Sequence, residues 1–232
     1  MKASLIIFGL AALVFSSCAT SINGPLNADG SASLTINASL EPRTAALIRN
    51  LSAAAGTAQG NVILDGPLIA QSMTAAPGMA SVSFRNTSPA AITGETHISQ
   101  IGEFLGGAQD FITFEQGASG GRCVITISRE TGPGILSLLS PQITEYLAAL
   151  MAPLATGEVL SIDEYLFMVS TVYNRAIADE ISRSRIQASI TFPGPIQSVR
   201  GGTFSGRRAY FDIPLVDLLV LETPLSYEVV WN

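Results

Sequence analysis

The feature that most constrains this chain is an apolar run near its start that ends shortly before a cysteine. Residues 5–15 have the length of the hydrophobic part of an export signal and are too short to cross a bilayer as a helix. Lys2 supplies the positive charge that precedes such a run. Phe15-Ser16-Ser17-Cys18 then has the form of a lipobox, with Phe15 where leucine is usual. The sequence therefore predicts export, removal of residues 1–17 and a mature chain that begins at Cys18.

Acylation of Cys18 would attach the mature protein to a membrane through palmitate-type chains. Two long acyl chains bury many methylenes at about 0.8 kcal/mol each, which is enough for stable anchoring. After Cys18 no charge-free apolar run reaches the roughly 18 residues of a membrane-spanning helix. We therefore expect a lipid-anchored protein of a bacterial cell envelope, on a periplasmic or outer-membrane face. The alternative is an ordinary secretory signal with a chance cysteine.

The composition predicts a folded domain. Charged residues make up 13% of the chain and hydrophobic residues 47%, so a core can be buried. The net charge of −6 becomes one unit more negative when Lys2 is removed, which argues against nucleic acid as a partner. Acylation of Cys18 leaves Cys123 as the one thiol, which excludes an intramolecular disulfide. Because Cys123 alternates with Ile125 and Ile127, we expect it in the core.

Patterning divides the chain into a signal peptide (1–17), an acylated cysteine with a short polar tether (18–30) and one domain (31–232). Alternation from Leu34 to Leu40 predicts a half-buried strand, and Pro42 to Ala55 a helix. Residues 79–129 are typical of short antiparallel strands, with a hairpin turn at residues 117–121. The last fifty residues return to strands, with a short helical segment at residues 214–221.

Two principal helices are predicted between these strand regions. Residues 134–151 carry one charge, Glu145, and are rich in apolar residues, and Ser161 to Ile181 has apolar residues at helical spacing. Ser161 and Glu164 form a capping box at the start of the second helix. The predicted fold class is thus α+β, with an antiparallel sheet packed against these two helices.

No pattern in the sequence points to an enzyme, a cofactor or a metal site. Residues 117–121 match the G-x-S-x-G pattern of serine hydrolases, but strand-like residues follow them, whereas that pattern needs a helix. The single histidine, His97, precedes the serine, opposite to the order in that fold. The acidic pairs Asp163-Glu164 and Asp179-Glu180 lie near the ends of the predicted second helix, and we expect them to be solvated.

Two groups of residues are candidates for binding an amphiphile. The first contains five arginines, and no acidic residue lies between the first and the last of them: Arg183, Arg185, Arg200, Arg207 and Arg208. Guanidinium groups bind phosphate, so this group could meet lipid headgroups; the alternative is a solvated sheet edge. The second group would border an acyl-chain cavity between sheet and helices: Leu138, Leu147 and Val169. The apolar stretch at 135–151 could equally be plain core or dip into the bilayer surface.

A segment near the end resembles the LppM-like domain of bacterial lipoproteins. It consists of a strand that ends at Pro193-Gly194, a glycine turn at Gly201-Gly202, a strand over residues 209–212 and a short apolar segment at 214–221. The lipobox, first strand and first helix also fit, whereas the middle of the chain does not. That family often ends in a transmembrane helix, and this sequence does not. The resemblance implies an α+β domain beside a membrane, with glycolipid or phospholipid binding, and it assigns no catalytic residue.

These observations lead to two functional hypotheses. The first is a non-enzymatic, lipid-anchored envelope protein that binds a phospholipid, glycolipid or other amphiphile between sheet and helices. The second is a structural or assembly lipoprotein that contacts another envelope protein. A cavity between sheet and helices would favour the first hypothesis, and a filled core with an exposed apolar patch the second.

Overall fold

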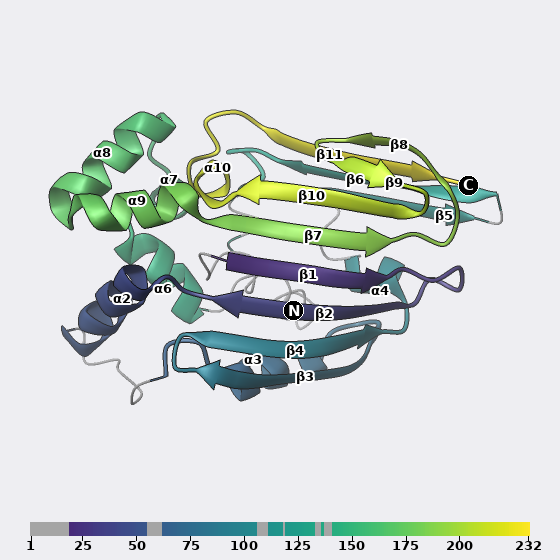
Figure 1. Ribbon diagram of the computed structural model, residues 1–232, viewed down its shortest axis with the longest axis horizontal. Helices are drawn as coiled ribbons and strands as arrows, with labels where there is room; N and C mark the ends of the chain where they lie inside the picture. Colours follow the sequence, from purple (N-terminus) through teal and green to yellow (C-terminus); the bar gives the residue numbers. More distant parts are fainter. Residues whose placement is uncertain (1–18, 55–61, 106–110, 118, 133–135, 137–140) are drawn as a thin grey trace.

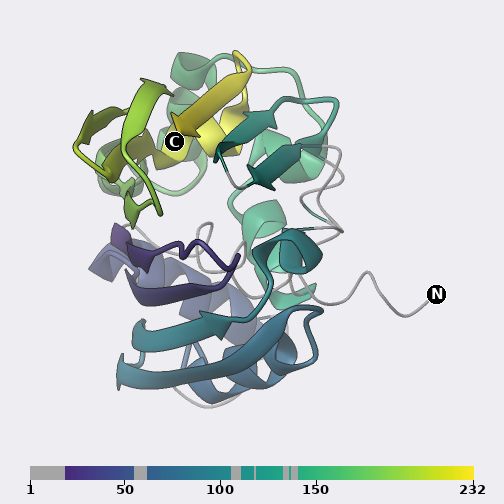
Figure 2. The same cartoon turned by 90° about the vertical axis from the view of Figure 1, so that its right-hand side faces the viewer.

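The computed structural model describes residues 19–54, 62–105, 111–117, 119–132, 136 and 141–232. They form an α+β domain with two sheets (Figures 1 and 2). Sheet A contains, in spatial order, β3 (Met79–Ser88), β4 (Ala91–Ile98), β2 (Ala32–Ser39), β1 (Ala19–Pro25), β7 (Arg185–Thr191), β10 (Arg208–Pro214) and β9 (Thr203–Ser205). Sheet B contains β5 (Ile112–Gly117), β6 (Gly120–Ile127), β11 (Leu225–Trp231) and β8 (Ile196–Arg200). The strand predicted at Leu34 is present as β2, and β5 and β6 pair as the predicted hairpin, with Gly117 opposite Gly120.

Strand β1 lies at the centre of sheet A. It pairs antiparallel with β2 and parallel with β7, from Ala19 opposite Arg185 to Pro25 opposite Thr191. The predicted antiparallel sheet is therefore wrong at this pair, and sheet A is mixed. The predicted tether is wrong over residues 19–25 as well, because Gly24 and Pro25 end a strand instead of marking a flexible linker. Thr20 and Ile22 are buried, as expected for a central strand.

Most helices gather at the end of sheet A where β1 and β7 begin (Figure 1). Those connected directly to sheet A there are α2 (Pro42–Ala54), α9 (Arg175–Arg183) and α10 (Leu215–Val220). They are joined by α6 (Pro141–Ala149), α7 (Pro153–Thr156) and α8 (Ile162–Val172). Behind sheet A lie α3 (Gly66–Thr74) and α4 (Ile101–Leu105). None of the helices in the described parts of the chain is long and apolar enough to span a membrane.

The two predicted principal helices are shorter than expected. The segment from Ser161 to Ile181 forms α8 and α9, because Asn174 begins a new helix by accepting a hydrogen bond from the Ile177 amide at 3.0 Å. The capping box of Ser161 and Glu164 is confirmed at the start of α8. Within residues 134–151 the structure describes α6; residues 134, 135 and 137–140 lie outside the described part.

Two apolar clusters hold the domain together. One lies between sheet A and sheet B, where Ile22 and Ile36 share a core with Val229 and Trp231. The Trp231 ring packs on Phe192 with 4.8 Å between ring centroids. The other cluster lies among the end helices and contains the buried residues of α8, α9 and α10. Sheet A therefore buries one face and leaves the other free.

One acidic pair predicted to be solvated is partly buried. Glu180 in α9 is 5% exposed, and its carboxylate accepts hydrogen bonds from the Arg43 amide, the Thr44 amide and the Thr44 hydroxyl at 3.2, 2.8 and 2.9 Å. The unpaired amides at the start of α2 need such an acceptor. Glu180 thus ties α9 to α2, whereas Asp179 is exposed as predicted.

Candidate functional site

The free face of sheet A is polar because every second residue of its strands is polar. The strand registers align these residues in rows that cross the strands. One row consists of Ser21, Gln187 and Asp212, and the next contains Asn23, Ser189 and Tyr210. Residues next to them in sequence are buried in the core, including Ile22, Ile186 and Ala209. The polar face is thus fixed by the same alternation that builds the core.

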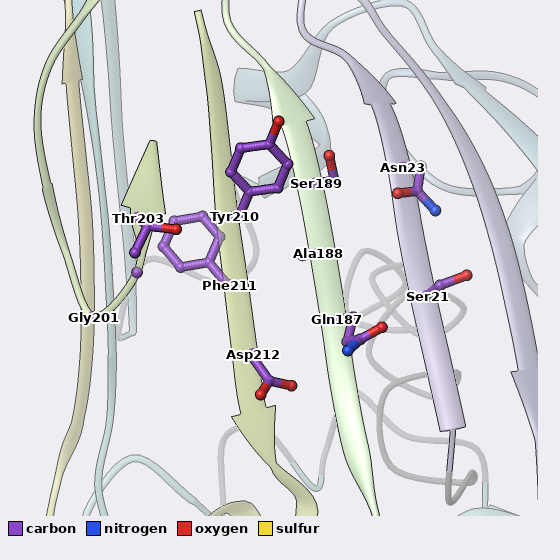
Figure 3. Close-up of a pocket in the computed structure, with 11 residues that line it drawn as sticks. Ser21, Asn23, Gln187, Ala188, Ser189, Gly201, Thr203, Tyr210, Phe211 and Asp212 are labelled. Atoms are coloured by element: carbon purple, nitrogen blue, oxygen red, sulfur yellow. The ribbon is translucent and has the colours of Figure 1, made fainter. Parts of the chain in front are cut away.

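A pocket of about 550 Å³ lies on this polar face over β1, β7 and β10 (Figure 3). Its volume falls within the roughly 300–1,000 Å³ typical of small-molecule sites. Side chains of the two polar rows form its floor, and the turn between β8 and β9 forms one wall. The residues that line it are Ser21, Asn23, Gln187, Ala188, Ser189, Gly201, Gly202, Thr203, Tyr210, Phe211 and Asp212.

The wall of the pocket depends on two glycines. Gly201 has a φ of 73°, a left-handed conformation that favours glycine, and a side chain there would also meet the Ser226 carbonyl oxygen at 2.7 Å. A Cβ on Gly202 would lie 2.4 Å from the Tyr210 carbonyl oxygen. The pair lets the turn fold closely onto β10, so Thr203 lies opposite Tyr210 at the pocket.

The chemistry of the pocket is hydrogen bonding. Serine, threonine and tyrosine hydroxyls and the amides of Asn23 and Gln187 can each donate and accept, while the Asp212 carboxylate only accepts. Asp212 is the one charged side chain among the lining residues, so the pocket disfavours phosphate. The exposed ring of Tyr210 offers an apolar surface beside these polar groups. This combination suits a neutral, hydroxyl-rich ligand.

The polar face continues beyond the pocket toward β4. The Asn37 amide donates to the Ser21 hydroxyl at 3.1 Å, and the Thr93 hydroxyl donates to the Asn37 side-chain oxygen at 2.6 Å. The Ser33 hydroxyl oxygen and the His97 Nδ1 atom lie 3.0 Å apart on neighbouring strands. Within the described ranges, no group of three or more His, Cys, Asp or Glu side chains is placed to hold a metal ion. The face therefore offers further hydrogen-bonding groups beyond the pocket, with Glu95 among them on β4.

The five candidate arginines do not form one patch. Arg183 ends α9 and Arg185 begins β7, whereas Arg208 lies opposite Thr191 at the other end of β7, about 20 Å from Arg185. Arg208 donates to the Thr191 hydroxyl at 3.1 Å, and Arg207 donates to the Pro193 carbonyl oxygen at 3.2 Å. The arginines are close in sequence but not in space, because the full length of β7 separates Arg185 from Arg207 and Arg208.

Arg200 belongs to sheet B rather than to either arginine group of sheet A. It lies at the end of β8 and forms an ion pair with Glu228 of β11 at 3.4 Å. Glu228 also pairs with Arg122 of β6 at 2.7 Å. Arg200, which has no acidic residue near it in sequence, thus pairs with the acidic Glu228 of another strand.

The two described residues of the predicted acyl-chain cavity are core residues. Leu147 is 2% exposed and Val169 is fully buried, and both belong to the cluster among the end helices. Leu138 and Cys18 lie outside the described residues. Their predicted roles in ligand binding and lipid attachment stay predictions.

Sequence reasoning missed the pocket for two reasons. Ser21 and Asn23 were assigned to the tether, although Ser21, Ile22 and Asn23 already alternate polar and apolar as in a strand. Tyr210 and Asp212 were recognised as strand residues, but their neighbours in space come from β1 and β7. The alternation of polar and apolar residues could have predicted the polar face. Nothing in the sequence predicted which strands are neighbours in the sheet.

Comparisons with known proteins give one distant likeness. No family model matches this chain, and a search of curated proteins finds no similar sequence. Among solved structures, the chain is similar to the NMR structure of the folded domain of LppM from Mycobacterium tuberculosis. The match has a TM-score of 0.43 and 8% sequence identity, and it covers 92% of this chain and 88% of that domain. It is a distant likeness of fold between chains that share few residues.

Proposed function

We propose that this chain is a lipid-anchored envelope lipoprotein that binds the neutral, hydroxyl-rich headgroup of an amphiphile and does not transform it. The pocket on sheet A carries this proposal. Its floor presents hydroxyl and amide groups in two rows, and the Tyr210 ring lies beside them. A sugar or polyol headgroup has the matching donors and acceptors, together with C–H faces that pack on an aromatic ring.

The pocket supports headgroup binding better than acyl-chain binding. Acyl chains need an apolar, enclosed cavity, whereas this pocket is lined largely by polar side chains on an exposed sheet face. The helices that were expected to cover an acyl chain instead pack Leu147 and Val169 into a common core. The acyl chains of the ligand would therefore remain in the membrane while its headgroup occupies the pocket.

Binding without catalysis is the simpler use of these side chains. General acid–base catalysis needs two groups of different proton affinity within reach of one bond. The lining residues include one carboxylate, Asp212, and no histidine, cysteine or lysine. Besides Asp212, the other acidic group of the lining is the Tyr210 hydroxyl, two residues away on the same strand, and both can orient a ligand by hydrogen bonds.

The test is native mass spectrometry of the acylated full chain purified from bacterial membranes, followed by extraction of bound lipid. We expect a bound amphiphile with an uncharged, hydroxylated headgroup. Asp212→Ala and Asn23→Ala should each lose it, because each removes a polar group from the pocket floor. Thr35→Ala is the matched control, since Thr35 lies opposite Asn23 on β2 but outside the pocket.

Two results would contradict headgroup binding. One is a protein that carries no amphiphile and takes up none from vesicles of envelope lipids. The other is equal loss of ligand in the Thr35→Ala control. Either result would favour the assembly hypothesis, in which the polar face of sheet A contacts another envelope protein.

A further inference from the structure

The strand that follows Cys18 leaves almost no flexible linker between the domain and a lipid anchor. β1 begins at Ala19 and pairs with β2 through five residue pairs and with β7 through seven. Peeling β1 away to act as a tether would break sheet A at its centre. An acylated Cys18 would therefore hold the domain within one residue, about 3.8 Å of chain, of the bilayer surface.

The start of β1 also decides which end of the domain meets the bilayer. The register partners of Ala19 are Ser39, which precedes α2, and Arg185, which follows α9. In Figure 1, α8 and α9 extend beyond the start of β1 along the long axis of the molecule. The nine residues of α9 measure about 13 Å along the helix axis. The turn between α8 and α9 thus projects past the point where the anchor leaves sheet A.

This projecting part carries exposed apolar side chains. Phe167 is 73% exposed and Val172 is 55% exposed, although α8 buries Tyr165 and Val169 on its opposite side. Arg175 follows the turn, is exposed and forms no ion pair with any residue in the described ranges. An aromatic ring, an aliphatic side chain and a free guanidinium suit the boundary between lipid headgroups and acyl chains.

We infer that the second half of α8 and the α8–α9 turn, with Phe167, Val172 and Arg175, rest in the headgroup region of the bilayer that holds the acyl chains of Cys18. This inference rests on the proposed anchor, and it adds a second, non-covalent contact that fixes the orientation of the domain. Sheet A then stands with its helical end on the membrane and its strands rising from it. The pocket faces sideways above the headgroups.

The contact depends on apolar insertion more than on charge. Asp163 and Glu164 are exposed about one turn before Phe167 and disfavour an anionic surface. The contact should therefore form on neutral phosphatidylcholine vesicles and persist at high salt. A contact with the bilayer held only by the charge of Arg175 would weaken as the salt concentration rises.

The test places a tryptophan on α8 of the full acylated chain in phosphatidylcholine vesicles with bromine near the headgroup end of the acyl chains. The one native tryptophan, Trp231, is 2% exposed in the core and gives a constant background. Phe167→Trp should lose emission in brominated relative to unbrominated vesicles. Phe204→Trp is the matched control, because Phe204 is 44% exposed on β9, away from the helical end.

The outcomes separate the orientation from the anchor. Quenching of Phe167→Trp but not of Phe204→Trp, at low and high salt alike, supports the inference. If the intact mass shows acylated Cys18 but both variants are quenched equally or not at all, the orientation is wrong and the anchor stands. If the mass shows an unmodified Cys18, the anchor and the orientation are both overturned.

Discussion

At the scale of single residues, Glu180 is the clearest case of a side chain with a structural task. Its carboxylate is nearly buried and accepts three hydrogen bonds from the first turn of α2. Sequence reasoning placed it at a solvated helix end because Asp179, its neighbour, is indeed exposed. The partner that decides the difference lies more than a hundred positions away, so local sequence gave no sign of it.

Replacing Glu180 should separate α9 from α2. Glu180→Ala leaves buried donors without an acceptor, and we expect a loss of about 2–3 kcal/mol in the free energy of unfolding. Glu180→Gln keeps one acceptor and should lose less. Urea denaturation measures both, with Asp179→Ala as the exposed control, which should stay within about 0.5 kcal/mol of the wild type. Equal effects of the Asp179 and Glu180 variants would contradict the assignment.

Cys123 provides a second test at this scale. Burial raises the pKa of the Cys123 thiol to about 11, so roughly one thiol in a thousand is ionised at pH 8. The folded protein should react slowly with a disulfide reagent at that pH and quickly in urea. Because the chain has two cysteines, the unfolded protein should show one thiol if Cys18 is acylated and two if it is free. Fast reaction of the folded protein would place Cys123 at the surface.

At the scale of elements, the sequence predicted the helices that begin at a residue typical of helix starts. Pro42 begins α2 as predicted, and Ser161 begins α8 with its capping box. The break after α8 was missed because the apolar spacing continues through Tyr173 into Ile177. Asn174, a good helix start, was the available signal.

The capping box of α8 gives a prediction with a pH dependence. The Ser161 amide and hydroxyl donate to Glu164 at 2.8 and 2.9 Å, and these hydrogen bonds hold the pKa of that carboxyl below its usual 4.5. Ser161→Ala should lower the free energy of unfolding by about 1 kcal/mol at pH 7. A carboxyl with a lowered folded pKa stabilises the protein above its unfolded pKa, and this contribution disappears as pH falls through the folded value.

The difference between wild type and Ser161→Ala should therefore shrink below about pH 4.5. Thermal unfolding followed by circular dichroism at pH 7 and pH 3 measures it. Thr171→Ala on the exposed side of the same helix is the control and should show no such change with pH. A difference that stays constant with pH would mean that the Ser161 hydroxyl does not stabilise the Glu164 carboxylate.

At the scale of the whole molecule, the fold class was predictable and the strand order was not. Alternation identified most strands of both sheets, yet β1 was taken for a tether because its short polar residues and its final glycine and proline are typical of linkers. Its parallel partner β7 lies near the other end of the chain. The polar pocket depends on that pairing, so the pocket could not be predicted either.

Removing β1 tests this pairing. A chain that begins at Ala19 should fold, whereas a chain that begins at Asn27 lacks the centre of sheet A and should not unfold cooperatively. Circular dichroism and the dispersion of amide resonances compare the two. If the shorter chain kept a cooperative transition at a similar temperature, residues 19–25 would be a tether after all.

The parallel pairing of β1 and β7 also sets the order in which an exported chain can assemble. In a chain exported as proposed, β1 would leave the membrane first and could at once form a sheet with β2 and β4, which follow soon after it in sequence. Its other edge stays open until β7 has crossed the membrane, long after. During that interval an unpaired edge next to the proposed anchor would be available to other strands, so protection from aggregation would matter most before β7 arrives.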